Sequence, residues 1–340
     1  MLLLSIETSC DETAAAVVRD GREILSSVIS SQISIHAAYG GVVPEIASRK
    51  HLESLSPVIN QAIGDAGVKM EVIEGIAVTR GPGLSGALLV GFSAAKAIAA
   101  ARQIPFVGIH HIEGHLFAPF LEQKIDFPFL ALVVSGGHTH LYHVENFGEY
   151  KTLGKTIDDA AGEAFDKCAK IMGMPYPGGV LIDRMAQSGN PEAVRLPRPL
   201  LRDGTLNFSF SGLKTAVMQH IEKNPISKSG KEADDLCASF QKAVCDVLSA
   251  KTEAAILHTG TNRLVVAGGV ACNSGLRSRM LELCKQMKVE LYIPQPSLCG
   301  DNAAMIAVPG DYYLSNGFAS SQSLDVTASW DMDSIREFTK

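Results

Sequence analysis

The chain has 340 residues, 46% of them hydrophobic, which is enough for a large buried core divided between two lobes. Its formal net charge of -6 excludes a freestanding nucleic-acid binder, because neutralising phosphates requires a concentrated basic surface. Seven scattered cysteines without a C-x-x-C pair exclude a disulfide framework and favour a reducing cytoplasm. The sequence shows no basic, apolar export signal and no convincing membrane span, so we expect neither.

The N-terminal sequence predicts a three-stranded meander. Short apolar or alternating stretches are separated by polar turns, and the expected strands cover residues 2–6, 13–18 and 23–29. The sequence that follows predicts a helix at 44–66, a strand at 75–79 and a small-residue helix at 84–101.

Residues 129–154 repeat the meander. The stretch FLALVVS is followed by the turn GGHT, then by HLYHVEN and EYKTLGK. A repeated meander with helical sequence after each copy predicts an internally duplicated α/β protein with two equivalent lobes facing a cleft. The remaining expected elements are helices at 158–172, 212–222 and 232–258, an irregular region at 174–212, strands at 264–267 and 291–293, and a last helix.

The most specific local pattern is His-His-Ile-Glu-Gly-His at 110–115. On a helix, His111 and His115 lie about 40° apart, which suits two imidazole ligands of one metal ion. Structural histidines at this spacing on an ordinary helix face are the alternative. A metallopeptidase would use a nearby glutamate as its base, but Glu113 projects about 160° from both histidines. The spacing therefore favours a metal over a peptidase.

Two glycine-containing segments are candidate anion sites. At the end of an expected strand, a glycine turn can present backbone N–H groups to phosphate or carboxylate, although a plain hairpin is the alternative. This segment comprises Val133, Val134, Ser135, Gly136 and Gly137. Residues 268–273 follow a buried strand and open a helix, where nucleotides dock in α/β folds, but they lack the full G-x-G-x-x-G pattern.

Several acids are candidate cleft residues. Asp301 lies at the expected start of the last helix, where a carboxylate either caps the helix or binds a hard metal. Asp11 and Glu12 follow the first strand, and Asp166 lies on an expected helix. Each of these last three could equally belong to a solvated surface.

Nine segments in order, covering nearly the whole chain, together resemble the bacterial TsaD family. These segments are IETSCDET (6–13), HAAYGGVVPEIASRKH (36–51), GPGLSGALLVG (81–91), HHIEGHLFAP (110–119), VSGGHTHL (134–141), GEAFDKCAK (162–170), FSFSGLKT (208–215), GGVACNSGLR (268–277) and CGDNAAM (299–305).

The resemblance implies a duplicated actin-like fold of the sugar-kinase and heat-shock ATPase kind, with two lobes around a cleft. Residues 1–122 and 302–340 would form the first lobe, and residues 123–301 the second. It also implies a tRNA N6-adenosine threonylcarbamoyltransferase. Such an enzyme moves the threonylcarbamoyl group from threonylcarbamoyl-AMP to N6 of adenosine 37 in tRNAs that read codons beginning with A. A metallopeptidase, the family's older designation, and an actin-like kinase or regulatory ATPase are the alternatives.

The resemblance assigns roles to particular residues. His111, His115 and Asp301 would hold one divalent metal ion, iron as Fe²⁺ first and Zn²⁺ second. The chemistry of the transfer, and not the resemblance, makes Asp11 or Glu12 the tentative base for the attacking amine. The expected substrate-binding residues are Val133, Val134, Ser135, Gly136, Gly137, Asp166, Gly179, Asp183 and Asn273.

The implied partners are tRNA, a paralogous actin-like subunit of the TsaB type and a small P-loop ATPase of the TsaE type, all in the cytoplasm. The net charge gives little general attraction for RNA, although four basic residues could form a local edge: Arg195, Arg198, Arg202 and Lys214.

Three positions depart from the family pattern. His140 stands where relatives often carry Gln or Leu, and Cys272 replaces a common small residue. Pro309 is expected to end the last helix early, because proline removes a helical hydrogen bond.

Overall fold

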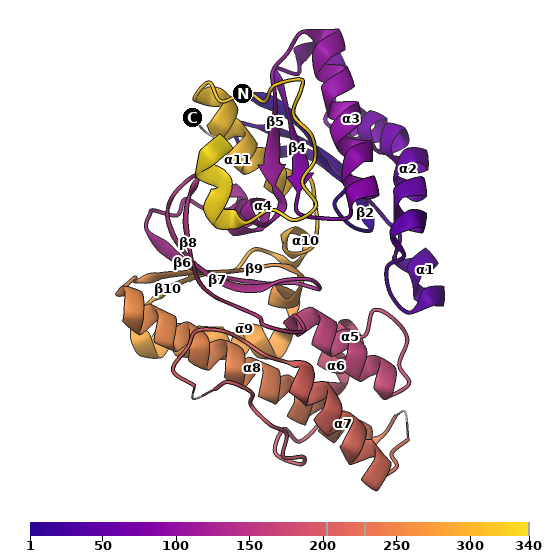
Figure 1. The fold of residues 1–340 in the computed structure, drawn as a ribbon, viewed down its shortest axis with the longest axis vertical. Helices are drawn as coiled ribbons and strands as arrows, with labels where there is room; N and C mark the ends of the chain where they lie inside the picture. Colours follow the sequence, from indigo (N-terminus) through magenta and orange to yellow (C-terminus); the bar gives the residue numbers. More distant parts are fainter. Residues whose placement is uncertain (202, 228, 339–340) are drawn as a thin grey trace. The chain divides into compact units, whose positions relative to one another are not determined.

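Figure 1 shows the computed structural model, which describes residues 1–201, 203–227 and 229–338; Arg202 lies outside these residues. The chain forms two compact units. The first comprises residues 1–126, 146–150 and those from 300 onward, and the second comprises residues 127–145 and 151–299. The expected lobe bounds of 1–122 with 302–340 and 123–301 stay a prediction.

The first unit contains a five-stranded sheet in the order β3-β2-β1-β4-β5. The first three strands form the predicted antiparallel meander, and β4 and β5 add to β1 in parallel. In β1 the pairing places Leu4 opposite Val17 and Ile6 opposite Ala15. The strands are β1 (Leu2–Glu7), β2 (Glu12–Arg19), β3 (Glu23–Ser31), β4 (Gly75–Gly81) and β5 (Phe106–His110).

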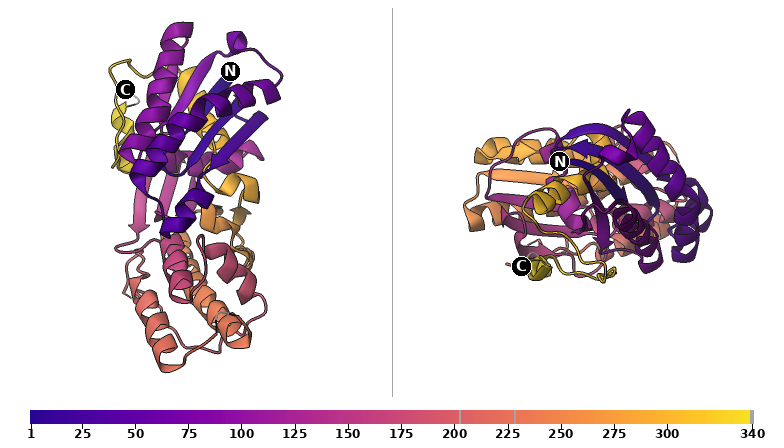
Figure 2. Two further views of the ribbon diagram at one scale, coloured as in Figure 1. Left: turned by 90° about the vertical axis from the view of Figure 1, so that its right-hand side faces the viewer. Right: turned by 90° about the horizontal axis from the view of Figure 1, so that it is seen from above.

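Helices cover both faces of this sheet. Leu4 and Ile6 of β1 pack with residues of α2 and α3, whereas Leu3, pointing the other way, packs with residues of α11. Figure 2 shows α2 and α3 against the strands in its left view. The helices of this unit are α1 (Ile33–His36), α2 (Pro44–Asp65), α3 (Ser85–Arg102), α4 (His111–Phe117) and α11 (Ala304–Ser315), with 3₁₀ turns η1 (Ala37–Tyr39), η2 (Met70–Val72), η3 (Ala118–Leu121) and η5 (Met332–Phe338).

Pro309 does not end the last helix, so that expectation is wrong. It lies inside α11, buried, with helix continuing on both sides. The apolar residues around it pack against β1, β4 and β5, and this tertiary packing outweighs the loss of one helical hydrogen bond.

Among the described residues, no helix is both long enough and apolar enough to cross a membrane.

The second unit repeats the sheet plan, which confirms the predicted duplication. Its strand order is β10-β9-β6-β7-β8, so β6, β7 and β8 correspond to β1, β2 and β3. The pairing of β6 with β7 is antiparallel, and β9 joins β6 in parallel. The strands are β6 (Phe129–Val134), β7 (Thr139–Asn146), β8 (Glu149–Lys155), β9 (Arg263–Ala267) and β10 (Glu290–Tyr292).

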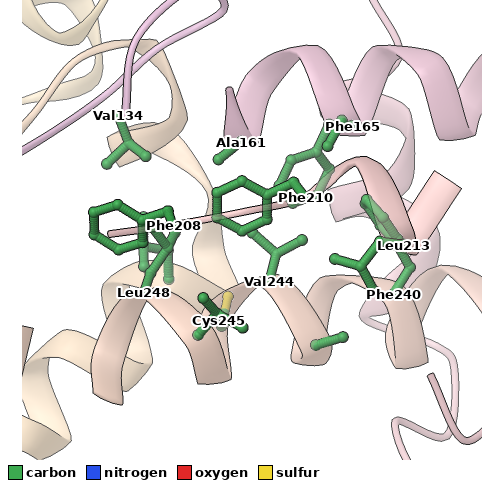
Figure 3. Close-up of a cluster of buried hydrophobic side chains, with 14 of the residues drawn as sticks. Val134, Ala161, Phe165, Phe208, Phe210, Leu213, Phe240, Val244, Cys245 and Leu248 are labelled. Carbon is green, nitrogen blue, oxygen red and sulfur yellow. The ribbon is translucent and has the colours of Figure 1, made fainter. Parts of the chain in front are cut away.

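The core of the second unit lies between this sheet and its helices. Figure 3 shows Phe208 and Phe210 among the side chains of α5 and α8. Phe165 and Phe240 meet edge to face, with ring centroids 5.1 Å apart. The helices are α5 (Ala161–Ile171), α6 (Gly179–Ala186), α7 (Ser211–Lys223), α8 (Lys231–Thr259), α9 (Ser274–Met287) and α10 (Pro296–Cys299), with the 3₁₀ turn η4 (Gly269–Cys272).

Two expectations for this unit were wrong in detail. The region 174–212 is not wholly irregular, because it contains α6. The helix expected from 158 begins at Ala161, and Asp158 instead accepts hydrogen bonds from the hydroxyls of Ser209 and Ser211 and from the backbone N–H of Phe210. Asp158 thereby anchors the segment that carries the two core phenylalanines.

Candidate functional site

The two histidines of the predicted metal pair lie on α4, a short helix that starts directly at the end of β5. His110 caps this helix, because its Nδ1 accepts a hydrogen bond from the backbone N–H of Ile112 at 3.1 Å. His111 and His115 are one turn apart on buried positions, with ring centroids separated by 4.8 Å. The predicted helix and its shared histidine face are therefore present.

Asp301 joins these histidines in the first unit. Its Oδ1 lies 3.1 Å from His115 Nε2 and 3.6 Å from His111 Nε2. Helix α11 begins only at Ala304, and Asn302 accepts a hydrogen bond from the N–H of Met305 at 2.9 Å. The side-chain acceptor at the start of α11 is thus Asn302, which precedes the N-cap residue Ala303, and the carboxylate of Asp301 faces the imidazoles.

Glu7 orients the first histidine. This residue ends β1 and is fully buried, and its Oε2 accepts a hydrogen bond from His111 Nδ1 at 3.2 Å. The other ring nitrogen, Nε2, is then directed toward Asp301. Burial opposes protonation of His111, but Asp301 and Glu7 raise the pKa of its imidazole to about 9. Burial likewise works against ionisation of Glu7, but the charge of His111 keeps its pKa below the usual value.

The donor set fits a divalent metal ion. Within the described residues, His111, His115 and Asp301 form a group whose ligand atoms all lie within 4.8 Å of one another. Both histidines direct Nε2 toward the carboxylate of Asp301, so each of the three side chains contributes one ligand atom to the group. A carboxylate behind a ligating imidazole is the usual way in which proteins orient that ligand. Glu7 has this position behind His111.

The turn after β1 brings Asp11 and Glu12 near the same group. His51 of α2 holds this turn, because its two ring nitrogens contact the hydroxyl of Thr13 at 2.7 Å and the carbonyl of Cys10 at 2.9 Å. Burial, followed by the charges of Asp11 and Asp301, raises the pKa of Glu12 to about 9. Without a nearby cation, Glu12 is therefore protonated at neutral pH and cannot accept a proton.

Glu113 is turned away from the imidazoles, as its spacing predicts. Its carboxylate is buried and accepts hydrogen bonds from the hydroxyls of Tyr150 and Tyr313. Burial raises the pKa of Glu113 to about 7, although both tyrosines oppose the shift. These two hydrogen bonds link α4 to Tyr313 of α11 and to Tyr150 of β8.

The second unit has a separate cavity of about 290 Å³. It lies between the turn after β6, helices α5 and α6, and the η4 turn. Five of the expected substrate-binding residues line it: Gly136, Asp166, Gly179, Asp183 and Asn273. The other lining residues are Gly162, Phe165, Pro177, Val180, Gly269, Val270 and Cys272.

The polar residues of this cavity also hold its walls. Asp166 Oδ1 accepts hydrogen bonds from the N–H groups of Gly178 and Gly179 at 2.8 and 3.4 Å, which fixes the start of α6. Asp183 accepts from the N–H and hydroxyl of Ser274 at the start of α9. Asn273 caps α9 through Leu276, and its amide donates to Gln241 Oε1 at 2.7 Å. Each of the three is thus held in place by its neighbours.

The expected substrate-binding segment 133–137 is buried at its start and exposed at its end. The side chains of Val133 and Val134 are fully buried, so only their backbone could contact a ligand. Gly136 and Gly137 are exposed at the turn. Two glycines permit the close packing around it: a Cβ on Gly162 would lie 2.5 Å from the Ser135 carbonyl oxygen, and one on Gly268, whose φ is +90°, would lie 2.4 Å from that of Val134.

The sequence matches one known protein family over most of its length. The model of the family described as tRNA N6-adenosine threonylcarbamoyltransferase (TsaD) matches residues 23–308. The chain belongs to this family. It is 72% identical over 337 residues to the tRNA N6-adenosine threonylcarbamoyltransferase of Pelobacter propionicus, covering 99% of each chain. It is 66% identical over 335 residues to the protein of the same name from Trichlorobacter lovleyi, covering 98% of each.

Solved structures place this TsaD-family chain in the actin-like fold class. HypF from T. kodakarensis matches 93% of the chain, using 48% of its own length, with a TM-score of 0.63 at 12% identity. Component A of the (R)-2-hydroxyglutaryl-CoA dehydratase of Acidaminococcus fermentans matches 93% of the chain and 99% of its own length, with a TM-score of 0.56 at 16% identity. These likenesses concern the fold alone, and they agree with the expected duplicated actin-like architecture.

Sequence reasoning missed Glu7 and His51. The first had a usable signal, because it is a carboxylate at the end of an otherwise apolar buried strand. The second had none, since His51 lies on a helix 38 residues from its partner Thr13 and is joined to it only by the fold.

We expect His111→Ala, His115→Ala and Asp301→Ala each to lose bound metal and transferase activity together, because two imidazoles and one carboxylate form a minimal ligand set. Metal content of the purified variants and tRNA modification would be measured in parallel. His258→Ala is the matched control, because this exposed histidine on α8 lies in the other unit. Full metal occupancy in all three variants would contradict the assignment of these residues as metal ligands.

Metal affinity should rise with pH. In the metal-free protein the His111 imidazole, with a pKa of about 9, holds a proton that a metal ion must displace. The apparent affinity for Zn²⁺ should therefore increase about tenfold per pH unit below that pKa. Equilibrium dialysis at several pH values between about 6 and 8 measures this slope. An affinity that is constant over this range would contradict the charged state of His111.

Glu113→Gln should keep metal and most of the transferase activity, because the carboxylate contacts tyrosines and the amide oxygen can replace it as acceptor. Glu113→Leu removes the acceptor and should lower the free energy of unfolding by about 1–3 kcal/mol. Activity assays and denaturant unfolding separate the two effects. If Glu113→Gln retained fold and metal but lost several orders of magnitude in turnover, a peptidase-like base would have to be reconsidered.

Proposed function

We propose that this chain transfers the threonylcarbamoyl group from threonylcarbamoyl-AMP to N6 of adenosine 37 in tRNAs that read codons beginning with A, forming N6-threonylcarbamoyladenosine and releasing AMP. The observation that carries this proposal is the end-to-end similarity to proteins of that name. The chain's own His111, His115 and Asp301 group supports it.

The cavity of the second unit is the proposed adenylate site. The glycine turn at Gly136 and the η4 turn at Gly269 lack side chains that would block the approach of a phosphate to the backbone. Asp183 and Asn273 form the polar part of the wall and are held by Ser274 and Gln241. Because these side chains are already ordered, binding of a ligand costs less conformational entropy.

The metal group of the first unit is proposed to hold Fe²⁺, with Zn²⁺ as the second choice. Two histidines and one carboxylate with remaining open positions are typical of non-haem Fe²⁺ sites, and they also suit catalytic zinc. When bound, the ion would supply Lewis-acid polarisation of an oxygen of the threonylcarbamoyl group.

The reaction makes modest demands on the protein. Threonylcarbamoyl-AMP is a mixed anhydride, so its carbonyl is already activated and AMP is a good leaving group. The N6 amine of the adenosine forms a bond to the carbamoyl carbon, the bond from that carbon to the phosphate oxygen breaks, and AMP leaves with the electron pair. Orientation and charge stabilisation then matter more than a strong nucleophile.

Asp11 or Glu12 is the proposed acceptor of the amine proton. Burial and the charges of Asp11 and Asp301 raise the pKa of Glu12 to about 9 without a metal ion, and the proposed ion beside Asp301 would lower that pKa. His51 fixes the turn that carries both residues and so sets the position of the proposed base.

Two alternative functions are less well supported. A metallopeptidase would need Glu113 near the metal group, whereas its carboxylate contacts Tyr150 and Tyr313. An actin-like kinase or regulatory ATPase would have no evident use for His111, His115 and Asp301. The relatives named as transferases match the whole chain at high identity, whereas HypF and the dehydratase component share only its fold.

Partner proteins are proposed to supply RNA affinity in the cytoplasm. The net charge is -6, and Arg198 of the expected basic edge is paired with Asp246 at 2.8 Å, so Arg195 and Lys214 are the exposed cations that remain among the described residues of that edge. The proposed partners are a TsaB-type actin-like subunit and a TsaE-type ATPase. Helix α2, which exposes Leu52, is the proposed pairing surface.

We expect the purified chain alone to be nearly inactive on tRNA and to gain activity with partners. The test combines tRNA and preformed threonylcarbamoyl-AMP at fixed salt, adds each partner in turn, and quantifies the modified nucleoside by mass spectrometry. Multiple turnover by the chain alone, unchanged by partners, would contradict the partner dependence. No modified nucleoside in the complete mixture would contradict the proposed function.

A further inference from the structure

Asn273 lines the cavity of the second unit, and the backbone fixes the orientation of its side-chain amide. The Oδ1 atom accepts a hydrogen bond from the backbone N–H of Leu276 at 2.9 Å. Because a backbone N–H can only donate, this atom must be the oxygen, and the amide nitrogen lies on the other side. That nitrogen donates to Oε1 of Gln241 at 2.7 Å. The two side-chain amides therefore each have one defined orientation.

Gln241 is a polar side chain buried among the apolar residues of α8. Only 8% of its surface is exposed, and Phe240 and Val244 of the same helix belong to the hydrophobic core. A buried amide costs free energy unless its polar atoms are hydrogen-bonded, so an apolar residue would fill this position at lower cost. The hydrogen bond from Asn273 offsets this cost, which indicates that holding Asn273 is the role of Gln241.

Gly275 leaves the space that the amide of Gln241 occupies. This glycine lies in the first turn of α9, and a Cβ on it would lie 2.6 Å from Nε2 of Gln241. Any side chain at position 275 would therefore displace the end of Gln241. Both residues line a groove of about 590 Å³, together with Lys242 and Ser278, so a displaced amide has room to move. The glycine thus serves Gln241 and not the helix, in which alanine is the more favourable residue.

The amide of Asn273 presents a hydrogen-bond donor to the cavity. An asparagine NH₂ group has two N–H bonds, and Gln241 accepts from one of them. Among the described residues this nitrogen has no second acceptor, so its other N–H is available to a ligand. Asp183 in the same cavity offers an acceptor, because its carboxylate is held by the N–H and hydroxyl of Ser274. The wall therefore offers one donor and one acceptor at fixed positions.

We infer that Gln241 is a positioning residue for the adenylate, holding Asn273 so that its amide donates to an oxygen of the bound nucleotide. This inference rests on the proposed adenylate site. Without the acceptor at Gln241, the amide of Asn273 loses the contact that fixes its nitrogen, and ligand binding must then order it. Gly275 acts one step further away, because it allows the amide of Gln241 to stay in place.

Isothermal titration calorimetry with AMP tests the positioning role. Gln241→Met keeps the length of the side chain but removes the acceptor, so the Kd for AMP should rise about three- to tenfold, the factor for one hydrogen bond. Gly275→Ala should raise this Kd by a similar factor, although the free energy of unfolding should be unchanged or higher. Ser278→Ala, an exposed change in the same groove, is the matched control and should bind AMP as the wild type does.

The double variant separates a shared cause from two independent defects. Gln241→Met combined with Gly275→Ala should bind AMP no more weakly than Gln241→Met alone, because both changes remove the same contact. Additive losses of AMP affinity in the double variant would overturn the positioning role. So would an unchanged AMP affinity in Gln241→Met, or a fall in the free energy of unfolding in Gly275→Ala that parallels its loss of AMP affinity.

Hydrogen exchange of the Asn273 side chain separates this inference from the proposed adenylate site. In NMR spectra of isotope-labelled protein without nucleotide, the Asn273 amide proton bonded to Gln241 should exchange slowly with solvent. It should exchange faster in Gln241→Met and in Gly275→Ala. If AMP fails to bind the wild type while this pattern is present, the adenylate site is wrong and the positioning of Asn273 by Gln241 stands. Equal exchange in all three proteins would overturn the positioning role even if AMP binds.

Discussion

The buried carboxylate of Glu7 is the constraint on which the first unit's site depends. It ends β1 and accepts hydrogen bonds from the backbone of Ser9, from the hydroxyl of Thr79 in β4 and from the imidazole of His111 in α4. An ionised carboxylate removed from water is costly unless it is paired, and leaving it unpaired typically costs about 3–5 kcal/mol. The ends of β1 and β4 and the start of α4 are therefore coupled, because Glu7 of β1 accepts one hydrogen bond from each of the other two elements.

Much of that site could be predicted from the sequence, for a physical reason. The helical period places His111 and His115 on one face whatever the rest of the fold does, so a local pattern sufficed. Asp301 was harder, because a carboxylate before a helix can be a cap or a ligand, and only the structure shows that Asn302, not Asp301, accepts the hydrogen bond from the first turn of α11. Glu7 and His51 act through long-range contacts that no local period encodes.

For the second unit, the sequence predicted the sheet better than the site. Its sheet plan followed from the repeat of the N-terminal meander, yet its cavity could not be built from the sequence. Helix α6 was missed because proline and glycine dominate the segment around it, whereas its stability comes from packing on α8. The acids of the cavity also have two roles at once. Asp166 and Asp183 line the wall and hold its loops, a combination that residue type alone does not reveal.

The duplicated sheets give the molecule two copies of the same hairpin, and the copies have diverged in charge. The turn between β1 and β2 carries Asp11, with Glu12 next to it, whereas the matching turn between β6 and β7 carries Gly136 and Gly137. An acidic loop repels phosphate and attracts cations, and a glycine loop offers bare amides to anions. The two copies of the hairpin therefore differ in the ions that their turns favour: the acidic turn favours cations, and the glycine turn favours anions.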